Sequence, residues 1–159
     1  MKKKFVPVIF LCIALMSSYI VFKSDISNKL EVSFLDVGQG DAIFIQSPSG
    51  VQVLIDGGKD RSVVGELHKV MPLFDKTIDM VVATHPDADH IGGLIDVLKI
   101  FNVDIFLESG GQGESNIQDA LEKQIKEKKI KRRISTRGEE YNLGSGVRLT
   151  VLYPYDDVS

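Results

Sequence analysis

Two imidazoles and two carboxylates lie within six residues of one another, between positions 85 and 90. The four side chains are His85, Asp87, Asp89 and His90, and neither Lys nor Arg stands among them. Carboxylates this close together repel each other unless a cation lies between them. Imidazole nitrogens bind Zn²⁺, iron and Mn²⁺, and carboxylate oxygens shift the preference toward harder ions. The residue types and their spacing therefore predict a metal site.

The elements on either side of this segment would position its side chains. Residues 78–83 are almost all apolar, which predicts a buried strand. Ile91, Leu94 and Leu98 then recur at helical spacing, which predicts a helix packed on the sheet. At a junction between a strand and a helix, side chains from the strand end and N–H groups from the helix start meet at one point. We therefore expect the four side chains to converge on one pocket.

Three sequence blocks carry a resemblance to a known family. The run from His85 to His90 resembles the first metal motif of the metallo-β-lactamase superfamily, usually written H-x-H-x-D-H, with Asp87 in place of the second His. Residues 34–41 (Phe-Leu-Asp-Val-Gly-Gln-Gly-Asp) and 54–58 (Leu-Ile-Asp-Gly-Gly) precede it. Together the blocks resemble the C-terminal hydrolase domain of competence proteins of the ComEC type. The resemblance covers residues 30–153 and corresponds to the N-terminal half of that domain.

The resemblance implies an α/β fold, called α+β in some schemes. In this family two halves, each a β-sheet with helices, pack face to face as an αββα sandwich with metals at the seam. Residues 30–159 are enough for about one half, so we expect a domain that is incomplete at its C-terminal end. One face of the sheet would then be apolar and exposed to solvent. It would need a missing C-terminal half or a second copy of the chain in a dimer.

The same resemblance implies roles for the ligands. His85 and Asp87 would bind one divalent ion, and Asp89 and His90 would bind a second. Asp89 would also be the catalytic residue, orienting the nucleophile. A catalytic zinc generally has three protein ligands and an open position, so two ligands per ion make half a site. Because a carboxylate replaces an imidazole at position 87, Mn²⁺ and Mg²⁺ join Zn²⁺ as candidates.

Two further aspartates, Asp41 and Asp56, stand in loops rich in glycine. Aspartate in such a loop often accepts backbone N–H bonds and fixes a turn. In the resembled family the equivalent loops border the metal site and hold the ligand loop in place. We therefore expect both carboxylates to support the metal ligands without binding the ions themselves.

Apolar periodicity and turn residues predict the remaining elements. The expected strands are 30–35, 42–46, 51–55, 103–107, 134–136 and 147–153, and the expected helices are 62–74 and 115–129. Between Lys126 and Arg133 stand six basic residues and one acid. This run favours a solvated helix face, with contact to a phosphate backbone as the alternative. His68, alone on its helix, receives no function.

Lys2–Lys4 precede an apolar run at residues 5–22, which predicts an export or anchor signal. About 18 residues at 1.5 Å each give roughly 27 Å, just enough to cross a bilayer core. No clean cleavage site follows, so residues 1–23 favour an uncleaved anchor over a cleaved signal peptide of a secreted protein, with 24–29 as linker. In both cases the domain lies outside the cytoplasmic membrane. The single cysteine, Cys12, excludes an intrachain disulfide and a Cys-based zinc site.

Three functions follow from these observations. With 43% hydrophobic residues the chain suits one globular domain, and a net charge of −3 gives no overall field that attracts nucleic acid. The leading hypothesis is a metal-dependent hydrolase of phosphodiesters, in nucleic acid or elsewhere, because hard ions suit phosphate oxygens. One alternative is a non-catalytic extracytoplasmic module or truncated relic that retains half a metal site. The other is a small-molecule β-lactamase or ester hydrolase.

Overall fold

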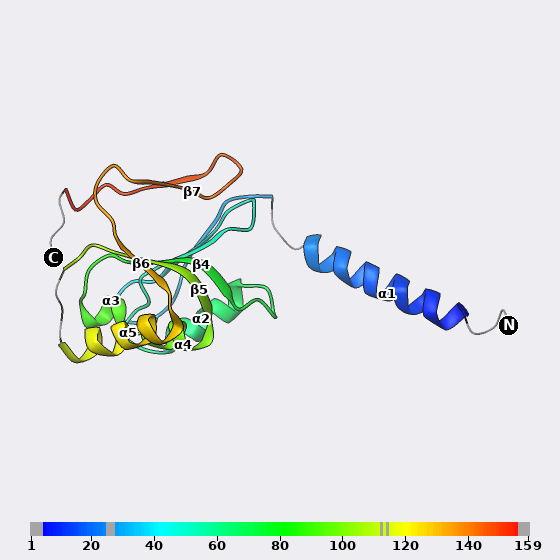
Figure 1. The fold of residues 1–159 in the computed structure, drawn as a ribbon, viewed down its shortest axis with the longest axis horizontal. Helices are drawn as coiled ribbons and strands as arrows, with labels where there is room; N and C mark the ends of the chain where they lie inside the picture. Colours follow the sequence, from blue (N-terminus) through cyan, green and yellow to red (C-terminus); the bar gives the residue numbers. More distant parts are fainter. Residues whose placement is uncertain (1–4, 25–27, 112, 114, 156–159) are drawn as a thin grey trace.

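The computed structural model describes residues 5–24, 28–111, 113 and 115–155. It shows a helix, α1 (Phe5–Ser24), followed by a six-stranded sheet with helices on one face and a β-hairpin on the other (Figure 1). This mixed architecture confirms the α/β fold class predicted from the sequence. Lys2–Lys4 and residues 25–27 of the expected linker lie outside the described residues.

The six-stranded sheet has its strands in sequence order. They are β1 (Glu31–Phe34), β2 (Ile43–Gln46), β3 (Gln52–Ile55), β4 (Thr77–Ala83), β5 (Asn102–Glu108) and β6 (Lys131–Ile134). β2 is antiparallel to β1 and β3, whereas β3, β4, β5 and β6 pair in parallel. The loops that follow β1, β3 and β4 therefore lie at the same end of the sheet, and this end carries the predicted site.

Helices α2 (Ser62–Val70), α3 (Ala88–Ile91), α4 (Leu94–Ile100) and α5 (Ser115–Lys128) cover one face of the sheet (Figure 1). The core between them is formed by side chains such as Leu54, Val81 and Phe106 of the strands and Leu94 and Phe101 on the helix side, all fully buried. Burial of apolar surface at about 25 cal/mol per Å² is the main force that fixes the strand ends beside the helix starts.

The hairpin formed by β7 (Glu140–Asn142) and β8 (Arg148–Thr150) lies on the opposite face of the sheet. Leu143, in its turn, is buried against Val53, Met80 and Leu107 of the sheet. The prediction that one whole face of the sheet is exposed to solvent is therefore wrong over β3–β5, because the hairpin covers these strands and excludes water. The sequence indicated strands near the hairpin but placed their limits at 134–136 and 147–153.

Three other predicted boundaries also differ. The helix expected at 62–74 ends at Val70, because Met71 is extended and Pro72 follows. The helix expected after residue 90 is divided into α3 and α4 at Gly92 and Gly93. The helix expected to reach residue 129 ends at Lys128, because Lys129 adopts a positive φ of 55°.

The basic run between Lys126 and Arg133 is only partly a helix face. Its first residues belong to α5, but Lys131, Arg132 and Arg133 form most of β6. The prediction of a solvated helix face is therefore wrong for these three residues. Parallel pairing of β6 with β5 determines their conformation, and this pairing joins segments more than twenty residues apart.

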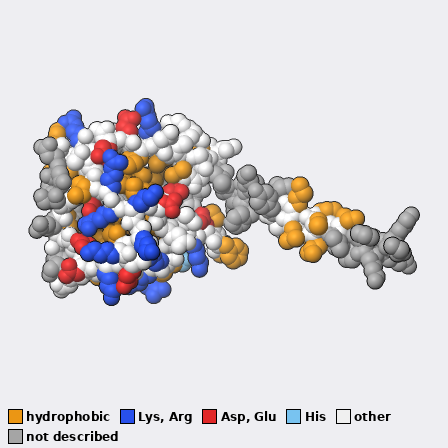
Figure 2. Space-filling view, viewed as in Figure 1, with side chains coloured by type: hydrophobic (Ala, Val, Ile, Leu, Met, Phe, Trp, Pro, Cys, Tyr) orange, Lys and Arg blue, Asp and Glu red, His pale blue; other side chains and the backbone are white. Residues whose placement is uncertain are grey.

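Helix α1 extends away from the sheet domain (Figure 1). Its described side chains are mostly apolar and exposed, among them Phe10, Leu11 and Met16 (Figure 2). Among the described residues, no helix combines the length and hydrophobicity that crossing a bilayer demands. The anchor and its topology stay predictions.

Candidate metal centre

Three loops meet at the carboxyl ends of β3 and β4 and are joined by backbone hydrogen bonds. The N–H of Gly57 donates to the carbonyl of His90 at 2.8 Å, and that of Gly58 donates to the carbonyl of Asp41 at 2.9 Å. The N–H of Gly93 donates to the carbonyl of Gly58 at 3.0 Å. The loop after β3 therefore holds both the loop after β1 and the His-rich loop after β4.

Two glycines allow these loops to approach each other closely. A Cβ atom at Gly40 would lie 1.7 Å from the carbonyl oxygen of Asp89, and one at Gly93 would lie 2.0 Å from that of Gly57. Both distances are far below van der Waals contact, so any side chain would separate the loops. Gly40, in the first sequence block, and Gly93, just after the third, thus serve the position of the loop that carries the histidines.

We expect Gly40→Ala to weaken binding of Zn²⁺ or Mn²⁺, because the added methyl group displaces the loop that carries Asp89 and His90. Gly138→Ala is the matched control. Gly138 has a φ of 91° against 89° for Gly40, but nothing lies within 4 Å of its missing Cβ atom. The two variants share the backbone penalty, and only the first has the clash. Equal metal affinities in a calorimetric titration would contradict this account of the loops.

The carboxylate of Asp56 lies at the centre of the site and is 3% exposed. Its Oδ1 accepts a hydrogen bond from the backbone N–H of Thr84 at 2.8 Å. Its Oδ2 accepts from the Thr84 hydroxyl at 2.5 Å and faces Nδ1 of His90 at 2.9 Å. Asp56 has a φ of 57°, a left-handed conformation that aspartate tolerates better than most residues.

This arrangement determines which nitrogen of each neutral histidine carries the proton. A carboxylate oxygen only accepts, so His90 Nδ1 and the Thr84 hydroxyl both donate to Asp56. Because the hydroxyl proton of Thr84 is used in this way, its oxygen accepts from Nδ1 of His85, which lies 2.9 Å away. Both imidazoles therefore carry the proton on Nδ1 and present a free lone pair on Nε2. An Nε2 lone pair is what a metal ion binds.

The two imidazole rings lie together, with their centroids 3.8 Å apart and their planes at 48°. Potential ligand atoms of Asp56, His85 and His90 all lie within 4.8 Å of one another. Although Asp56 belongs to this cluster, its two oxygens already take part in three hydrogen bonds. The geometry therefore gives Asp56 a role in positioning the histidines and leaves the two Nε2 atoms as the candidate metal ligands.

The other predicted site residues lie farther out. Asp87 has a side chain that is 69% exposed, and its Oδ2 is 3.6 Å from Nε2 of His85, too long for a hydrogen bond. Asp89 faces Gln39, whose amide lies 3.4 Å from its Oδ2. Asp41 is exposed and touches the site through its backbone carbonyl. The structure thus brings the histidines together with Asp56, with Asp87 at the rim, and turns Asp89 toward the first loop.

Sequence reasoning missed Thr84 and Gln39. Thr84 directly precedes His85, and its hydroxyl connects Asp56 to that imidazole. A hydroxyl residue next to a metal-binding histidine was the available signal. Gln39 gave no signal, because its contact with Asp89 spans 50 positions in the chain.

The donor set suits a divalent cation. Two imidazole lone pairs and the exposed carboxylate of Asp87 face the same region, and these are the ligand types that Zn²⁺ and Mn²⁺ accept. His85 Nε2 and Asp87 Oδ2 are both acceptors and lie 3.6 Å apart, with no hydrogen bond between them. A cation between them would remove the repulsion between two electron-rich atoms. The division of ligands between two ions stays a prediction.

A groove beside His85 leads toward α5 and β6, lined by Pro86, Gly110, Glu108 and Arg132 among others. Arg132 donates two hydrogen bonds to Glu108, at 2.5 and 3.0 Å, and its guanidinium lies 3.6 Å from Glu122. The hydrogen bonds to Glu108 raise the pKa of Arg132 above its usual value. This guanidinium is therefore committed to two carboxylates, so the basic run offers less free positive charge than its sequence indicates.

Two sequence comparisons relate this chain to known proteins. Residues 35–150 match the family model of the metallo-beta-lactamase superfamily. The chain is 29% identical over 129 residues to ComE operon protein 3 of Bacillus subtilis (strain 168), an alignment that covers 67% of this chain and 17% of that protein.

Solved structures share the fold. Rm3 metallo-beta-lactamase aligns with a TM-score of 0.53 and 17% identity, covering 75% of this chain and 47% of its own. MEM-A1, a subclass B3 metallo-beta-lactamase from a soil metagenome library, aligns with a TM-score of 0.52 and 17% identity, covering 77% and 49%. The chain spans about half the length of these structures and less than a fifth of the curated relative.

Proposed function

Since the chain belongs to the metallo-β-lactamase superfamily, we propose that it is a metal-dependent hydrolase domain, or the N-terminal half of one, that acts on phosphodiesters. The observation that carries the proposal is the set of hydrogen bonds that joins Asp56 to His90 and, through Thr84, to His85, because it leaves Nε2 of each neutral imidazole free to bind an ion. One sheet with its helices corresponds to half of the family's αββα sandwich.

A divalent ion held at this site would supply a Lewis acid that makes bound water more acidic and neutralises charge on the attacked group. The chain's own residues fix where that happens. His90 is held through Asp56, and His85 through Thr84, so neither ring can rotate without losing a hydrogen bond. The glycine contacts hold the surrounding loops in one arrangement. Such preorganisation keeps the reacting groups aligned.

The choice of phosphodiesters depends on Asp87. Its carboxylate stands where the family motif has an imidazole, and hard oxygen ligands favour Mn²⁺ or Mg²⁺ beside Zn²⁺. These ions bind phosphate oxygens well. The solved relatives named above are β-lactamases, so hydrolysis of a small-molecule β-lactam is the second candidate.

The experiment that tests the proposal is hydrolysis of bis-p-nitrophenyl phosphate by the full chain, with Mn²⁺ or Zn²⁺, with and without EDTA. We expect only weak, EDTA-sensitive turnover of the phosphodiester and none of nitrocefin, because two ligands per ion make half of a catalytic site. Turnover of nitrocefin alone would favour the β-lactamase. Bound metal without turnover of either substrate would favour a non-catalytic module.

We further propose that the domain lies outside the cytoplasm. The support is the position of Lys2–Lys4 ahead of the apolar run at residues 5–22, because positive charge stays on the cytoplasmic side. A reporter enzyme that is active only outside the cytoplasm, fused after Asp157, is expected to be active. Activity restricted to a reporter that works only inside the cytoplasm would contradict this topology.

A further inference from the structure

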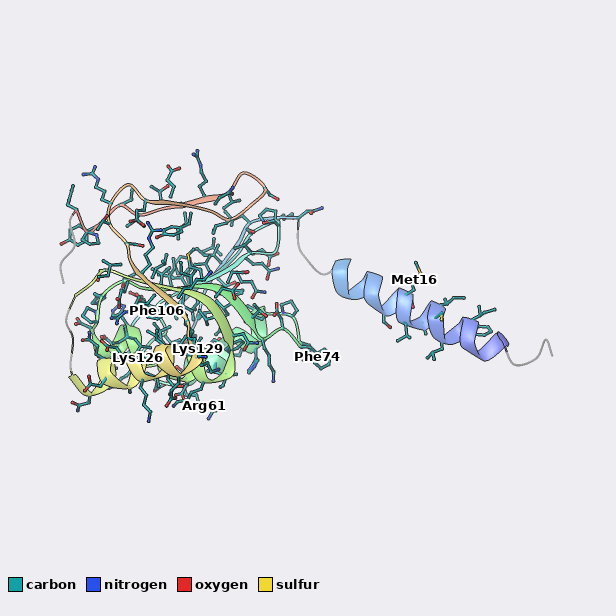
Figure 3. The ribbon with its side chains drawn as sticks, in the orientation of Figure 1. Met16, Arg61, Phe74, Phe106, Lys126 and Lys129 are labelled. Atoms are coloured by element: carbon teal, nitrogen blue, oxygen red, sulfur yellow. The ribbon has the colours of Figure 1, made fainter. Side chains whose placement is uncertain are left out.

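The turn between α2 and β4 exposes two large apolar side chains. Leu73 is 83% exposed and Phe74 is 77% exposed, and both stand between Pro72 and Asp75. Figure 3 shows Phe74 at the edge of the domain, pointing away from the sheet. Single exposed apolar residues are common, whereas contiguous exposed apolar surface marks interaction sites.

Hydrogen bonds hold this turn in one conformation. The N–H of Asp75 donates to the carbonyl of Pro72 at 2.9 Å. The Asp75 carboxylate accepts from the N–H of Thr77 at 3.0 Å and from the side-chain amide of Gln52 at 2.7 Å. Met71, on the other side of the turn, is buried. Leu73 and Phe74 are therefore presented outward by a fixed scaffold and do not fold back onto the core.

The turn lies at the end of the sheet where the apolar N-terminal helix is attached. β1 and β4 run in the same direction, so residues 28–30 and the turn before Thr77 lie at the same end. Figures 1 and 2 show that this end faces α1, whose apolar side chains are also exposed. The metal centre lies beyond the other end of β4. Because β4 has seven residues, the turn and the metal centre are about 20 Å apart.

The size and charge of this surface favour lipid over protein as its partner. The aromatic side chain of Phe74 offers about 150–250 Å², and the smaller Leu73 offers less, so the pair lies below the roughly 800 Å² that each partner buries in a stable protein interface. The exposed Lys76 follows the turn. Lys69 precedes the turn, and its ammonium pairs with Glu66 at 2.6 Å, although 68% of its side chain is exposed. Apolar tips beside an exposed lysine match the surface of an anionic bilayer, where the tips enter the acyl boundary and the cation meets the head groups.

We propose that Leu73 and Phe74 insert into the interface of an anionic phospholipid bilayer, so that the metal centre faces away from the lipid. This contact is separate from α1 and does not depend on the proposed hydrolysis. It would fix the orientation of the domain relative to the bilayer.

Tryptophan fluorescence of the full chain tests the proposal, because the sequence contains no tryptophan. Phe74→Trp places a reporter in the turn. Phe34→Trp places one at the other end of β1, where Phe34 is 80% exposed. The probe is a vesicle of equimolar phosphatidylcholine and phosphatidylglycerol, with a brominated lipid as quencher.

With these vesicles we expect a blue shift and strong quenching for Phe74→Trp and neither for Phe34→Trp. In vesicles of phosphatidylcholine alone, the quenching should weaken, because Lys76 then lacks an anionic lipid partner. Equal quenching of the two reporters, or no quenching of Phe74→Trp, would overturn the proposal. So would a blue shift of Phe74→Trp that requires an added protein and not lipid.

Discussion

Hydrolysis that depends on metal is expected to fall to background in His90→Ala and to be unchanged in His68→Ala. His90 presents Nε2 to the site, and its ring is held at 2.9 Å from Asp56. Without this imidazole the ion loses one of the two nitrogen ligands that the described residues supply. A mobile ion neither holds water in line nor stabilises charge at a fixed point.

His68→Ala is the matched control, because this substitution also removes an imidazole but from a place outside the metal centre. It lies exposed on α2, and its ring is 5.8 Å from that of Phe101, with no carboxylate partner among the described contacts. The measurements are kcat/KM for bis-p-nitrophenyl phosphate and metal affinity by calorimetry. If both variants lost activity equally, general damage to the fold would explain the result. If His90→Ala kept turnover, the site would lie elsewhere.

Asp56→Ala is expected to lower metal affinity about 10–100-fold, as is usual when a residue that orients a metal-binding histidine is removed. Asp56→Asn should be nearly as harmful. An amide replaces one of the two acceptor oxygens with a donor, so either Thr84 or His90 faces a group that cannot accept its proton. If the amide donates to His90, that ring must carry its proton on Nε2 and cannot bind the ion there.

Asp41→Ala is the control for this prediction. The Asp41 carboxylate is exposed, and the link of this residue to the site is its backbone carbonyl, which the substitution keeps. Titration with Zn²⁺ and Mn²⁺ measures the affinities, and far-UV circular dichroism checks that all three variants fold. An unchanged affinity in Asp56→Asn would show that this carboxylate does not set the tautomer of His90.

Local sequence patterns were enough to place the site on the fold. The apolar run of β4, the polar segment and the helical repeat that follows predicted a junction at the end of the sheet, and His85 and His90 converge there. The glycine-rich blocks predicted tight loops. These features depend on residues within a few positions of one another, and such patterns can be recognised in a single sequence.

The contacts inside the site could not be predicted in the same way. Asp56 meets Thr84 because β3 and β4 pair in parallel with Ile55 beside Val82. No local pattern encodes that register. The spacing of Asp87 and Asp89 suggested that both face the metal, and their part in metal binding stays a prediction. Asp89 stands in α3 and turns toward Gln39, whereas Asp87 precedes the helix.

The limits of the hairpin strands were misplaced for a related reason, although β8 lies within the expected strand at 147–153. β7 and β8 are three residues each, too short for alternation to distinguish them from loop, and Leu143 becomes buried only through contact with β3 to β5. The conformation of Lys131 to Arg133 likewise depends on β5. Burial against distant strands overrides local preference in both segments.

The outermost strands of the large sheet have different consequences for how this protein would behave in concentrated solution. β6 carries three consecutive cations, and such charges discourage another chain from adding a strand. β1 lacks this protection: Val32 is 48% exposed and Phe34 is 80% exposed. Unwanted fibrillar association would therefore begin at β1, and replacing Val32 with lysine is the simplest way to keep purified protein monodisperse.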